Sequence, residues 1–226
     1  MHKNISILIT LCFLFFKTGL NAQEFRIQSP PGYNFIYESN NLPKNVDGSP
    51  YLGDWQQSEL HLKNGNTISG IMMRYNVYTG QMIYKLDGKT YAIGTPDSIA
   101  TIQFGNKNFQ YKKFVVNDKV EQKYYEIIVD DKISLYNEYE IIINRSNYNS
   151  ALDVGDKNDK FVLKEHLYMI KGDRLIEIDK KRKILDFFAD KKGEITEFIK
   201  QEKISYKDKE DMAKLVEYYN EISSES

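Results

Sequence analysis

The sequence predicts an α+β fold, in which an antiparallel β-sheet or small barrel domain is followed by two or three short C-terminal helices. Two observations lead to this prediction. From residue 57 to residue 178, short stretches rich in tyrosine and β-branched residues alternate with turn residues, which is typical of antiparallel strands. From residue 179 to residue 226, apolar residues instead recur every three or four positions, which is typical of amphipathic helices.

The first 22 residues have the layout of a secretory signal peptide. A short basic start precedes an apolar run over residues 5–16, and the segment ends on Ala22, a small residue at the expected cut before Gln23. A membrane-spanning helix needs roughly 20 apolar residues, whereas Lys17 ends this run much earlier. We therefore expect cleavage between Ala22 and Gln23, and an exported protein that is periplasmic, on the cell surface or secreted.

Cleavage of this segment would also change the chemistry open to the chain. It would remove Cys12, the only cysteine, so the mature chain would have no disulfide, no thiol nucleophile and no thiolate metal site. It would leave 29 basic and 32 acidic residues, a net charge of −3, with both signs interspersed. This pattern argues against a nucleic-acid partner. We expect no transmembrane segment after cleavage.

Composition divides the mature chain into three segments. Residues 23–56 hold four of the five prolines with many Asn, Gly and Ser residues, which favours an extended, loop-like arm. Residues 57–178 form the mostly antiparallel β domain, interrupted by a polar loop at residues 144–159. Residues 179–226 form the helical C-terminal segment.

Turn residues divide the β domain into hairpins. Leu60 and Leu62 alternate with polar residues before a turn at Asn64-Gly65, and Gly70 in the return strand predicts a bulge. The other expected strand pairs are 81–86 with 90–93 across Asp87-Gly88, 98–104 with 109–116 across Gly105-Asn106, 123–129 with 133–143 across Asp130-Asp131, and 161–170 with 175–178 across Gly172-Asp173.

The last helix has the clearest helical period. Met212, Leu215, Val216 and Tyr219 are spaced i, i+3, i+4 and i+7 along one helix face. Ser205, with Asp208 three residues later, predicts a capping box at the start of this helix. Two earlier helices are expected from the apolar groups at residues 184–188 and 195–199.

Motifs for catalysis or cofactor binding are scarce. The sequence has no GxSxG elbow, Walker loop, GxGxxG turn or HExxH pair, so we expect no catalytic residue and no cofactor. One acidic loop is a weak candidate for a metal site, because hard cations prefer several oxygen ligands. Its residues are Asp153, Asp156, Asn158 and Asp159. The loop does not fit the EF-hand pattern and contains lysines, so we interpret it as an ordinary polar loop and expect no metal.

Two short sequences are possible glycosylation sites in an exported chain. Asn144-Arg145-Ser146 fits the N-glycosylation acceptor pattern, which matters only in a host with that machinery. Asp97-Ser98-Ile99 resembles the triplet for O-glycosylation of exported Bacteroidota proteins, with Ser98 as the acceptor. The alternative interpretation of this triplet is simply the start of a strand.

Two resemblances follow from these motifs. Residues 59–70, a strand, a turn with glycine and a second strand with a bulge glycine, resemble the opening hairpin of SH3-like and Sm-like barrels. Such barrels bind peptides or nucleic acids, but no binding residue transfers from one hairpin. Residues 74–76, 97–99 and 215–220 resemble uncharacterised exported (periplasmic or surface) proteins of Bacteroidota. That resemblance implies a bacterial cell envelope and no activity.

We therefore expect a soluble, non-enzymatic binding or interaction module of the bacterial cell envelope, whose partner is an envelope protein, a peptide or a glycan. The many tyrosines support this hypothesis, because their amphipathic rings suit binding surfaces. The alternative explanation of the tyrosines is that they only cover the sheet. Two other functions stay open: a periplasmic hydrolase that uses paired carboxylates, and a structural subunit of an envelope complex.

Overall fold

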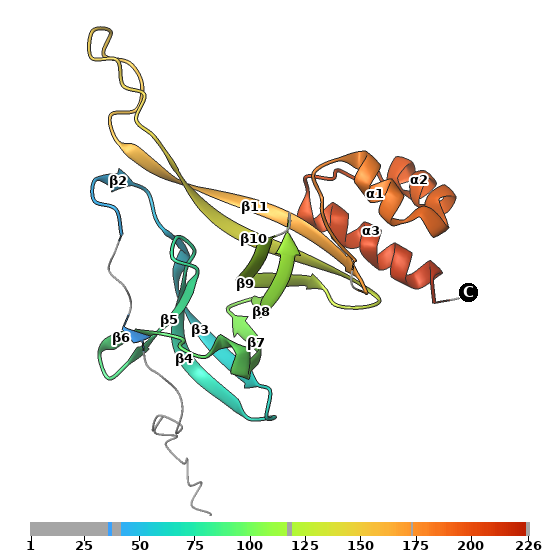
Figure 1. Ribbon diagram of the computed structural model, residues 1–226, viewed down its shortest axis with the longest axis horizontal. Coiled ribbons are helices and arrows are strands. Elements are labelled where there is room, and N and C mark those ends of the chain that lie inside the picture. Colours follow the sequence, from blue (N-terminus) through green and yellow to red (C-terminus); the bar gives the residue numbers. More distant parts are fainter. Residues whose placement is uncertain (1–35, 38–41, 117–118, 173, 225–226) are drawn as a thin grey trace, which may run out of the picture. The chain divides into compact units, whose positions relative to one another are not determined.

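The computed structural model describes residues 36–37, 42–116, 119–172 and 174–224 (Figure 1). The expected signal peptide and half of the expected arm lie outside these residues. The described chain forms one twelve-stranded sheet followed by three α-helices. The strand order is β1-β6-β5-β4-β3-β7-β8-β9-β10-β11-β12, and β2 pairs with β11.

The strands are β1 (Ile36–Tyr37), β2 (Val46–Asp47), β3 (Tyr51–Leu62), β4 (Thr67–Asn76), β5 (Gln81–Leu86), β6 (Lys89–Ala92), β7 (Ile99–Phe104), β8 (Lys107–Val116), β9 (Lys119–Val129), β10 (Ile133–Asn144), β11 (Asp159–Lys171) and β12 (Arg174–Glu177). The helices are α1 (Lys181–Phe187), α2 (Lys192–Gln201) and α3 (Lys209–Ile222). The prediction of a mostly β domain followed by short C-terminal helices is confirmed.

The hairpins form at the expected turns because the turn residues supply the backbone angles that tight turns need. Gly65 and Gly88 have φ values of 87° and 74°, which non-glycine residues rarely adopt. Gly70 has a φ of 76° and lies where the register between β3 and β4 shifts, so the predicted bulge is present. β3 begins at Tyr51, earlier than expected, and thus takes the end of the predicted arm into the sheet.

Two parts of the fold prediction need correction. The sheet is not wholly antiparallel, because β2 runs parallel to the start of β11, with Val46 opposite Asp159. Nor is it a closed barrel, because β1 and β12 end the strand order of the described residues without pairing with each other. The parallel pair was not predictable, since two residues show no periodicity and their partners lie more than a hundred positions along the chain.

Although the sheet is open, it curls tightly around an aromatic core. Tyr75 of β4 lies 5.7 Å from Phe109 of β8 and 5.8 Å from Tyr124 of β9, measured between ring centroids. In the strand order β4 and β8 are three steps apart, which would be about 14 Å in a flat sheet. Phe109 also packs against Tyr139 of β10. The curl therefore buries aromatic rings from strands that are far apart in the order.

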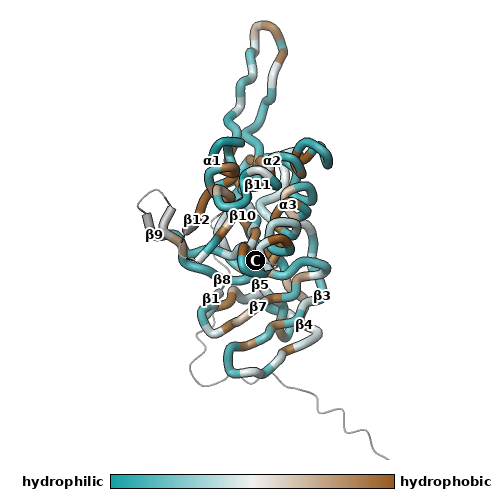
Figure 2. Tube along the Cα trace, turned by 90° about the vertical axis from the view of Figure 1, so that its right-hand side faces the viewer, coloured by the Kyte–Doolittle hydropathy of each residue, from teal (hydrophilic) through white to brown (hydrophobic). Residues whose placement is uncertain are grey.

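A second core lies between the three helices and the sheet (Figures 1 and 2). Leu135 of β10 and Met169 of β11 are fully buried there with Phe188, Leu215 and Val216. The alternation of side chains along β10 sends its even-numbered residues to the other face, where Tyr136 packs with Tyr125 and Tyr168. No helix of the described chain is both long enough and apolar enough to cross a membrane.

The start of α3 differs from the sequence prediction. The N-cap residue is Asp208, whose carboxylate accepts a hydrogen bond from the backbone N–H of Asp211 at 2.9 Å. The carboxylate of Asp211 in turn accepts the backbone N–H of Ser205 at 3.0 Å. The cap therefore lies three residues later than the predicted Ser205–Asp208 box, because aspartate is as good an N-cap residue as serine.

The end of α3 is tied to β10 by a side-chain amide. Asn220 accepts the backbone N–H of Ile133 and donates to its carbonyl, both at 2.9 Å. Asn220 and Ile133 are both buried, so no solvent would replace these two bonds. The amide thus extends the hydrogen bonding of β10 at a point where the sheet supplies no backbone partner.

We predict that N220A lowers the free energy of unfolding by about 2–4 kcal/mol, because it leaves two buried backbone groups of Ile133 without partners. Urea unfolding followed by circular dichroism measures this loss. The matched control is E217A, an exposed position of the same helix, which should change stability by less than about 0.5 kcal/mol. Equal stabilities of the two variants would contradict the role of Asn220.

Candidate functional site

The candidate site is a groove that begins where β9 and β10 part. These strands pair only from Leu135 to Glu138 of β10, and the last pair joins Glu138 to Tyr125. A register shift in this short ladder marks a β-bulge, which increases local twist. Beyond this point β9 continues beside β8, and β10 continues beside β11 as a two-stranded arm. The two ribbons diverge and leave a space between them.

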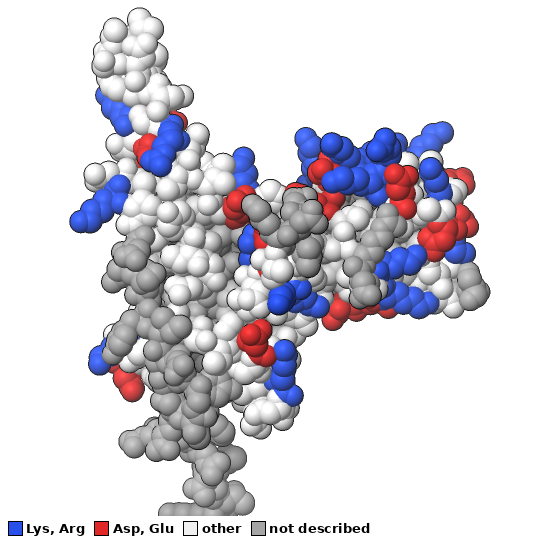
Figure 3. All heavy atoms as spheres, in the orientation of Figure 1, with Lys and Arg blue, Asp and Glu red and all other residues white. Residues whose placement is uncertain are grey.

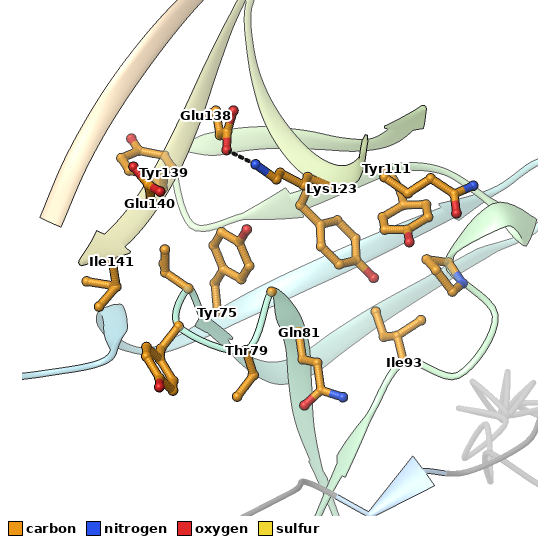
Figure 4. Close-up of a pocket in the computed structure, with 16 residues that line it drawn as sticks. Tyr75, Thr79, Gln81, Ile93, Tyr111, Lys123, Glu138, Tyr139, Glu140 and Ile141 are labelled. Carbon is orange, nitrogen blue, oxygen red and sulfur yellow. Dashed lines mark hydrogen bonds and ion pairs between the residues drawn. The ribbon is translucent and has the colours of Figure 1, made fainter. Parts of the chain in front are cut away.

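The groove has a volume of about 620 Å³ and is bounded by the ends of β9 and β10 and by the β4–β5 turn. In Figure 4, Tyr75, Thr79 and Gln81 lie on the side of the turn, facing Lys123 and Glu138 on the opposite side. Five tyrosines from four strands and the turn line it, namely Tyr75, Tyr78, Tyr111, Tyr124 and Tyr139. Because Tyr75, Tyr124 and Tyr139 are at most 5% exposed, the aromatic surface that the groove offers to a ligand comes mainly from Tyr78 and Tyr111.

Tyr78 fixes the position of the turn against the arm. Its ring packs edge-on against Phe161 of β11, with centroids 5.5 Å apart, and 37% of the residue stays exposed. The β4–β5 turn and β11 are therefore joined by a contact between side chains and not by backbone hydrogen bonds. Tyr78 is thus the lining tyrosine most accessible to a ligand that enters from solvent.

The pKa values of the hydroxyls of Tyr75, Tyr111 and Tyr124 are raised above the ordinary value of tyrosine. Burial raises the pKa of Tyr75, and the nearby carboxylate of Glu138 raises it further. Burial also raises the pKa of Tyr124 and, with the charge of Asp97, that of Tyr111. These hydroxyl groups are therefore available both as donors and as acceptors of hydrogen bonds.

Several polar atoms at the turn have no hydrogen-bond partner among the described residues. They are Thr79 Oγ1, Gln81 Oε1 and Asn76 Nδ2, and all three atoms are buried. Thr79 and Gln81 line the groove. Because all three atoms are enclosed, a ligand in the groove would reach them only if the turn moved.

One ion pair closes the narrow end of the groove. Lys123 Nζ binds the buried carboxylate of Glu138 and also lies 2.7 Å from Glu121 Oε2. Burial disfavours the charge of Lys123, but its bonds to these two carboxylates outweigh the burial and raise its pKa. The lysine is therefore held in place and charged at the point where β9 and β10 separate.

A buried carboxylate lies behind the groove, at the boundary with the helical core. Glu126 of β9 is 5% exposed and accepts hydrogen bonds from Lys107 Nζ and Tyr139 Oη, both at 2.7 Å. Lys209 at the start of α3 lies 3.3 Å from the same carboxylate, and Asn137 donates to it at 3.2 Å. Burial favours the neutral acid, but these donors outweigh it and lower the pKa of Glu126.

A second concavity, also about 620 Å³, lies between β11, β12 and the start of α3. It gathers ionisable groups, as a carboxylate hydrolase would require, but these groups already bind one another. Both ring nitrogens of His166 lie 3.1 Å from carboxylates, those of Glu177 and Glu140. Glu165 binds Lys209 and Asn137. Each ring nitrogen of His166 therefore already has a carboxylate neighbour.

The candidate metal residues all lie in or beside the loop at the end of the arm, but each has its own partner. Asp153 binds Tyr148 and Lys157, Asp156 binds Lys160, Asp159 binds Arg145, and Asn158 binds Asp47. Among the described residues, no three His, Cys, Asp or Glu side chains are placed to hold a metal ion.

The candidate glycosylation residues lie at strand ends. Asn144 is the exposed last residue of β10. Ser98 is partly buried just before β7, and its hydroxyl donates to the carbonyl of Thr95 at 2.7 Å. Ala22 and Gln23, the expected cleavage residues, lie outside the described residues.

No protein-family model, curated protein or solved structure matches this chain. The groove therefore has to be interpreted from its own residues. Sequence reasoning missed it because its tyrosines are spread from residue 75 to residue 139 and meet only through the curl. One feature of the sequence did point to the site. Tyr124 and Glu126 are two residues apart on one strand, so their side chains lie on the same face of the sheet, and an acid is placed beside an aromatic ring.

We predict that E126Q lowers stability near neutral pH by about 2–3 kcal/mol, because charged hydrogen bonds to a buried group are lost. Since folding lowers the pKa of Glu126, its carboxylate stabilises the fold above its unfolded pKa of about 4.3. This contribution disappears as the pH falls through the folded pKa. The stability of E126Q should therefore fall less than that of the wild type between about pH 5 and pH 3.

Urea unfolding at a series of pH values measures this difference. E217Q, at an exposed position of α3, is the control and should follow the wild-type pH dependence. If E126Q lost stability with acid as steeply as the wild type, the stabilising role of the Glu126 carboxylate would be wrong.

Proposed function

We propose that this protein is a non-enzymatic binding module of the bacterial cell envelope, and that it holds its ligand in the tyrosine-lined groove. The observation that carries the proposal is the groove itself. Five tyrosines line it, of which Tyr78 is the most exposed, and Thr79 and Gln81 add polar side chains to its wall. Tyrosine supplies large contact area at low entropic cost together with a hydrogen-bonding end, which is why it is common in binding surfaces.

The distribution of charge agrees with this proposal. In Figure 3 the charged side chains gather over the helical segment, whereas the visible face of the sheet carries few. Lys123, Glu138 and Glu140 are the charged residues that line the groove, and the first two form an ion pair. A largely uncharged ligand with polar groups along its length, such as a peptide or a glycan, suits these walls.

The proposed location in the envelope rests on the first 22 residues. Their basic start, short apolar run and terminal Ala22 fit a cleaved signal peptide, and the resemblance to exported Bacteroidota proteins agrees with it. Export would place the protein in the periplasm or at the cell surface, where it would meet envelope proteins, peptides and glycans.

A hydrolase is the weaker alternative, because His166 of the second concavity lies between the carboxylates of Glu140 and Glu177, and Glu165 is paired with Lys209. A structural subunit of an envelope complex is the other alternative. It would bind one stoichiometric partner through a surface that does not depend on the groove.

We predict that Y78A weakens binding of the envelope ligand at least about tenfold, because it removes the accessible ring of the groove. The wild type and variants are immobilised and incubated with envelope extract, and the retained material is quantified. Y84A is the matched control. Tyr84 stacks on Tyr91 and does not line the groove, so its loss should leave binding within about twofold.

Equal retention by the wild type, Y78A and Y84A would contradict binding in the groove. If that retention consisted of one stoichiometric protein, it would favour the structural-subunit alternative. Circular dichroism of each variant verifies that a loss of binding does not come from unfolding.

We also predict that the protein recovered from cells begins at Gln23. Mass spectrometry of its N-terminal peptide measures this directly. L14R, which places a charge inside the apolar run, should retain residues 1–22 and accumulate in the cytoplasm, because a signal peptide needs an uninterrupted apolar segment. Recovery of the wild-type protein from the envelope with Met1 still present would contradict cleavage.

A further inference from the structure

We infer that the ligand of the groove is an extended polypeptide segment of another protein, which pairs as an added strand with the open edge of β10. This inference rests on the proposed function, since it names the class of ligand that the groove takes. It depends on the backbone that borders the groove as well as on the side chains that line it.

The first observation is that two strand edges border the groove without a neighbour. β10 pairs with β11 over its whole length, up to Asn144, but with β9 only as far as Glu138. Residues 139–144 of β10 therefore have one edge unpaired among the described residues. Residues 119–124 of β9, which pair only with β8, leave a second such edge.

An open edge presents backbone N–H and C=O groups at every second residue, about 6.6 Å apart along the strand. Six residues of β10 supply about 20 Å of this pattern, enough for a peptide strand of similar length. A polypeptide carries the complementary pattern of donors and acceptors, and a glycan does not. The open edge therefore selects a peptide among the ligands that tyrosine walls accept.

The second observation is that side chains along this edge alternate in a way that specifies the added strand. Tyr139 and Ile141 line the groove, whereas Ile142 projects from the opposite face of the arm and is 39% exposed. An added strand would place apolar residues beside Tyr139 and Ile141, inside the groove. Residues of the same strand on the other face would lie beside Ile142 and beside Glu140, whose side chain also lines the groove.

The third observation is the charge beside the edge. Lys123 is engaged by both Glu138 and Glu121, so the groove has no second lysine to balance Glu140. The side chain of Glu140 is 48% exposed; the imidazole of His166 lies 3.1 Å from it, and Lys164 is opposite Glu140 on the β11 side of the arm. A lysine or arginine of the added strand would pair with Glu140. The partner is therefore a segment with alternating apolar residues and a basic residue on its other face.

The test uses the purified protein and a random dodecapeptide library displayed on phage, followed by synthesis of the enriched peptides. We expect strand-like sequences with alternating apolar residues and at least one basic residue. When such a peptide binds, hydrogen exchange of the backbone amides in residues 139–144 should slow at least about tenfold, because about half of them gain a partner. Exchange in residues 159–165 of β11 should stay unchanged.

Two variants support the exchange measurement. I141R places a charged side chain in the groove and should weaken peptide binding at least about tenfold. L163R is the matched control, because Leu163 is paired with Ile141 on the same arm, is 41% exposed, and lies one strand away from the open edge. It should bind peptides within about twofold of the wild type. Thermal unfolding of both variants verifies that the arm is folded.

Peptide binding without slower exchange in residues 139–144 would overturn strand addition but leave the proposed binding function intact. Binding of oligosaccharides instead of peptides, lost in Y78A, would overturn the peptide class and again leave that function intact. If no peptide bound and Y78A retained envelope material as well as the wild type, both the inference and the proposed function would be wrong.

Discussion

The buried carboxylate of Glu126 is the group on which the rest of the structure depends. It lies on β9 and is held by Lys107 of β8, by Asn137 and Tyr139 of β10, and by Lys209 of α3. A buried charge without partners costs several kcal/mol, and these partners come from elements distant in the sequence. The carboxylate is therefore tolerable only when the curled sheet and the docked helix are both in place. Its pairing makes the aromatic core and the helical core interdependent.

This dependence extends to the groove through Tyr139. The hydroxyl of Tyr139 binds Glu126, and its ring packs against Phe109. Tyr139 is also the first residue of β10 that no longer pairs with β9. The ion pair of Lys123 with Glu138 holds the neighbouring residue of the same strand. The direction in which the arm leaves the sheet is thus determined by buried polar contacts. The groove is bounded by rigid strands on one side and by a turn on the other.

The parts of the fold that were predictable are those specified by neighbouring residues. Asn64-Gly65 and Asp87-Gly88 determine their own hairpins, because the turns need positive φ at Gly65, Asp87 and Gly88, and Gly70 marks its bulge in the same way. The helix starting at Lys209 was recognised by its period, but its cap was placed three residues early because serine and aspartate are both good caps.

What could not be predicted depends on residues that meet only after the sheet has curled. The pairing of Val46 with Asp159 and the amide of Asn220 on Ile133 leave no local signal in the sequence. The same is true of the groove, since alternation tells which face a tyrosine occupies but not how strongly the sheet bends. Tyr75 and Tyr124 are 5.8 Å apart between ring centroids because of that bend.

The amide of Asn220 also has a consequence for the order in which the chain folds. Its partner Ile133 lies 87 residues earlier, at the first position of β10. A chain synthesised from its N-terminus presents β10 well before it presents α3. Until the last helix arrives, the backbone of Ile133 lacks its Asn220 partner, and the apolar face of β10 and β11 lacks Met212, Leu215 and Val216. Completion of this core must therefore wait for the C-terminal helix, so the native packing of β10 cannot precede the end of the chain.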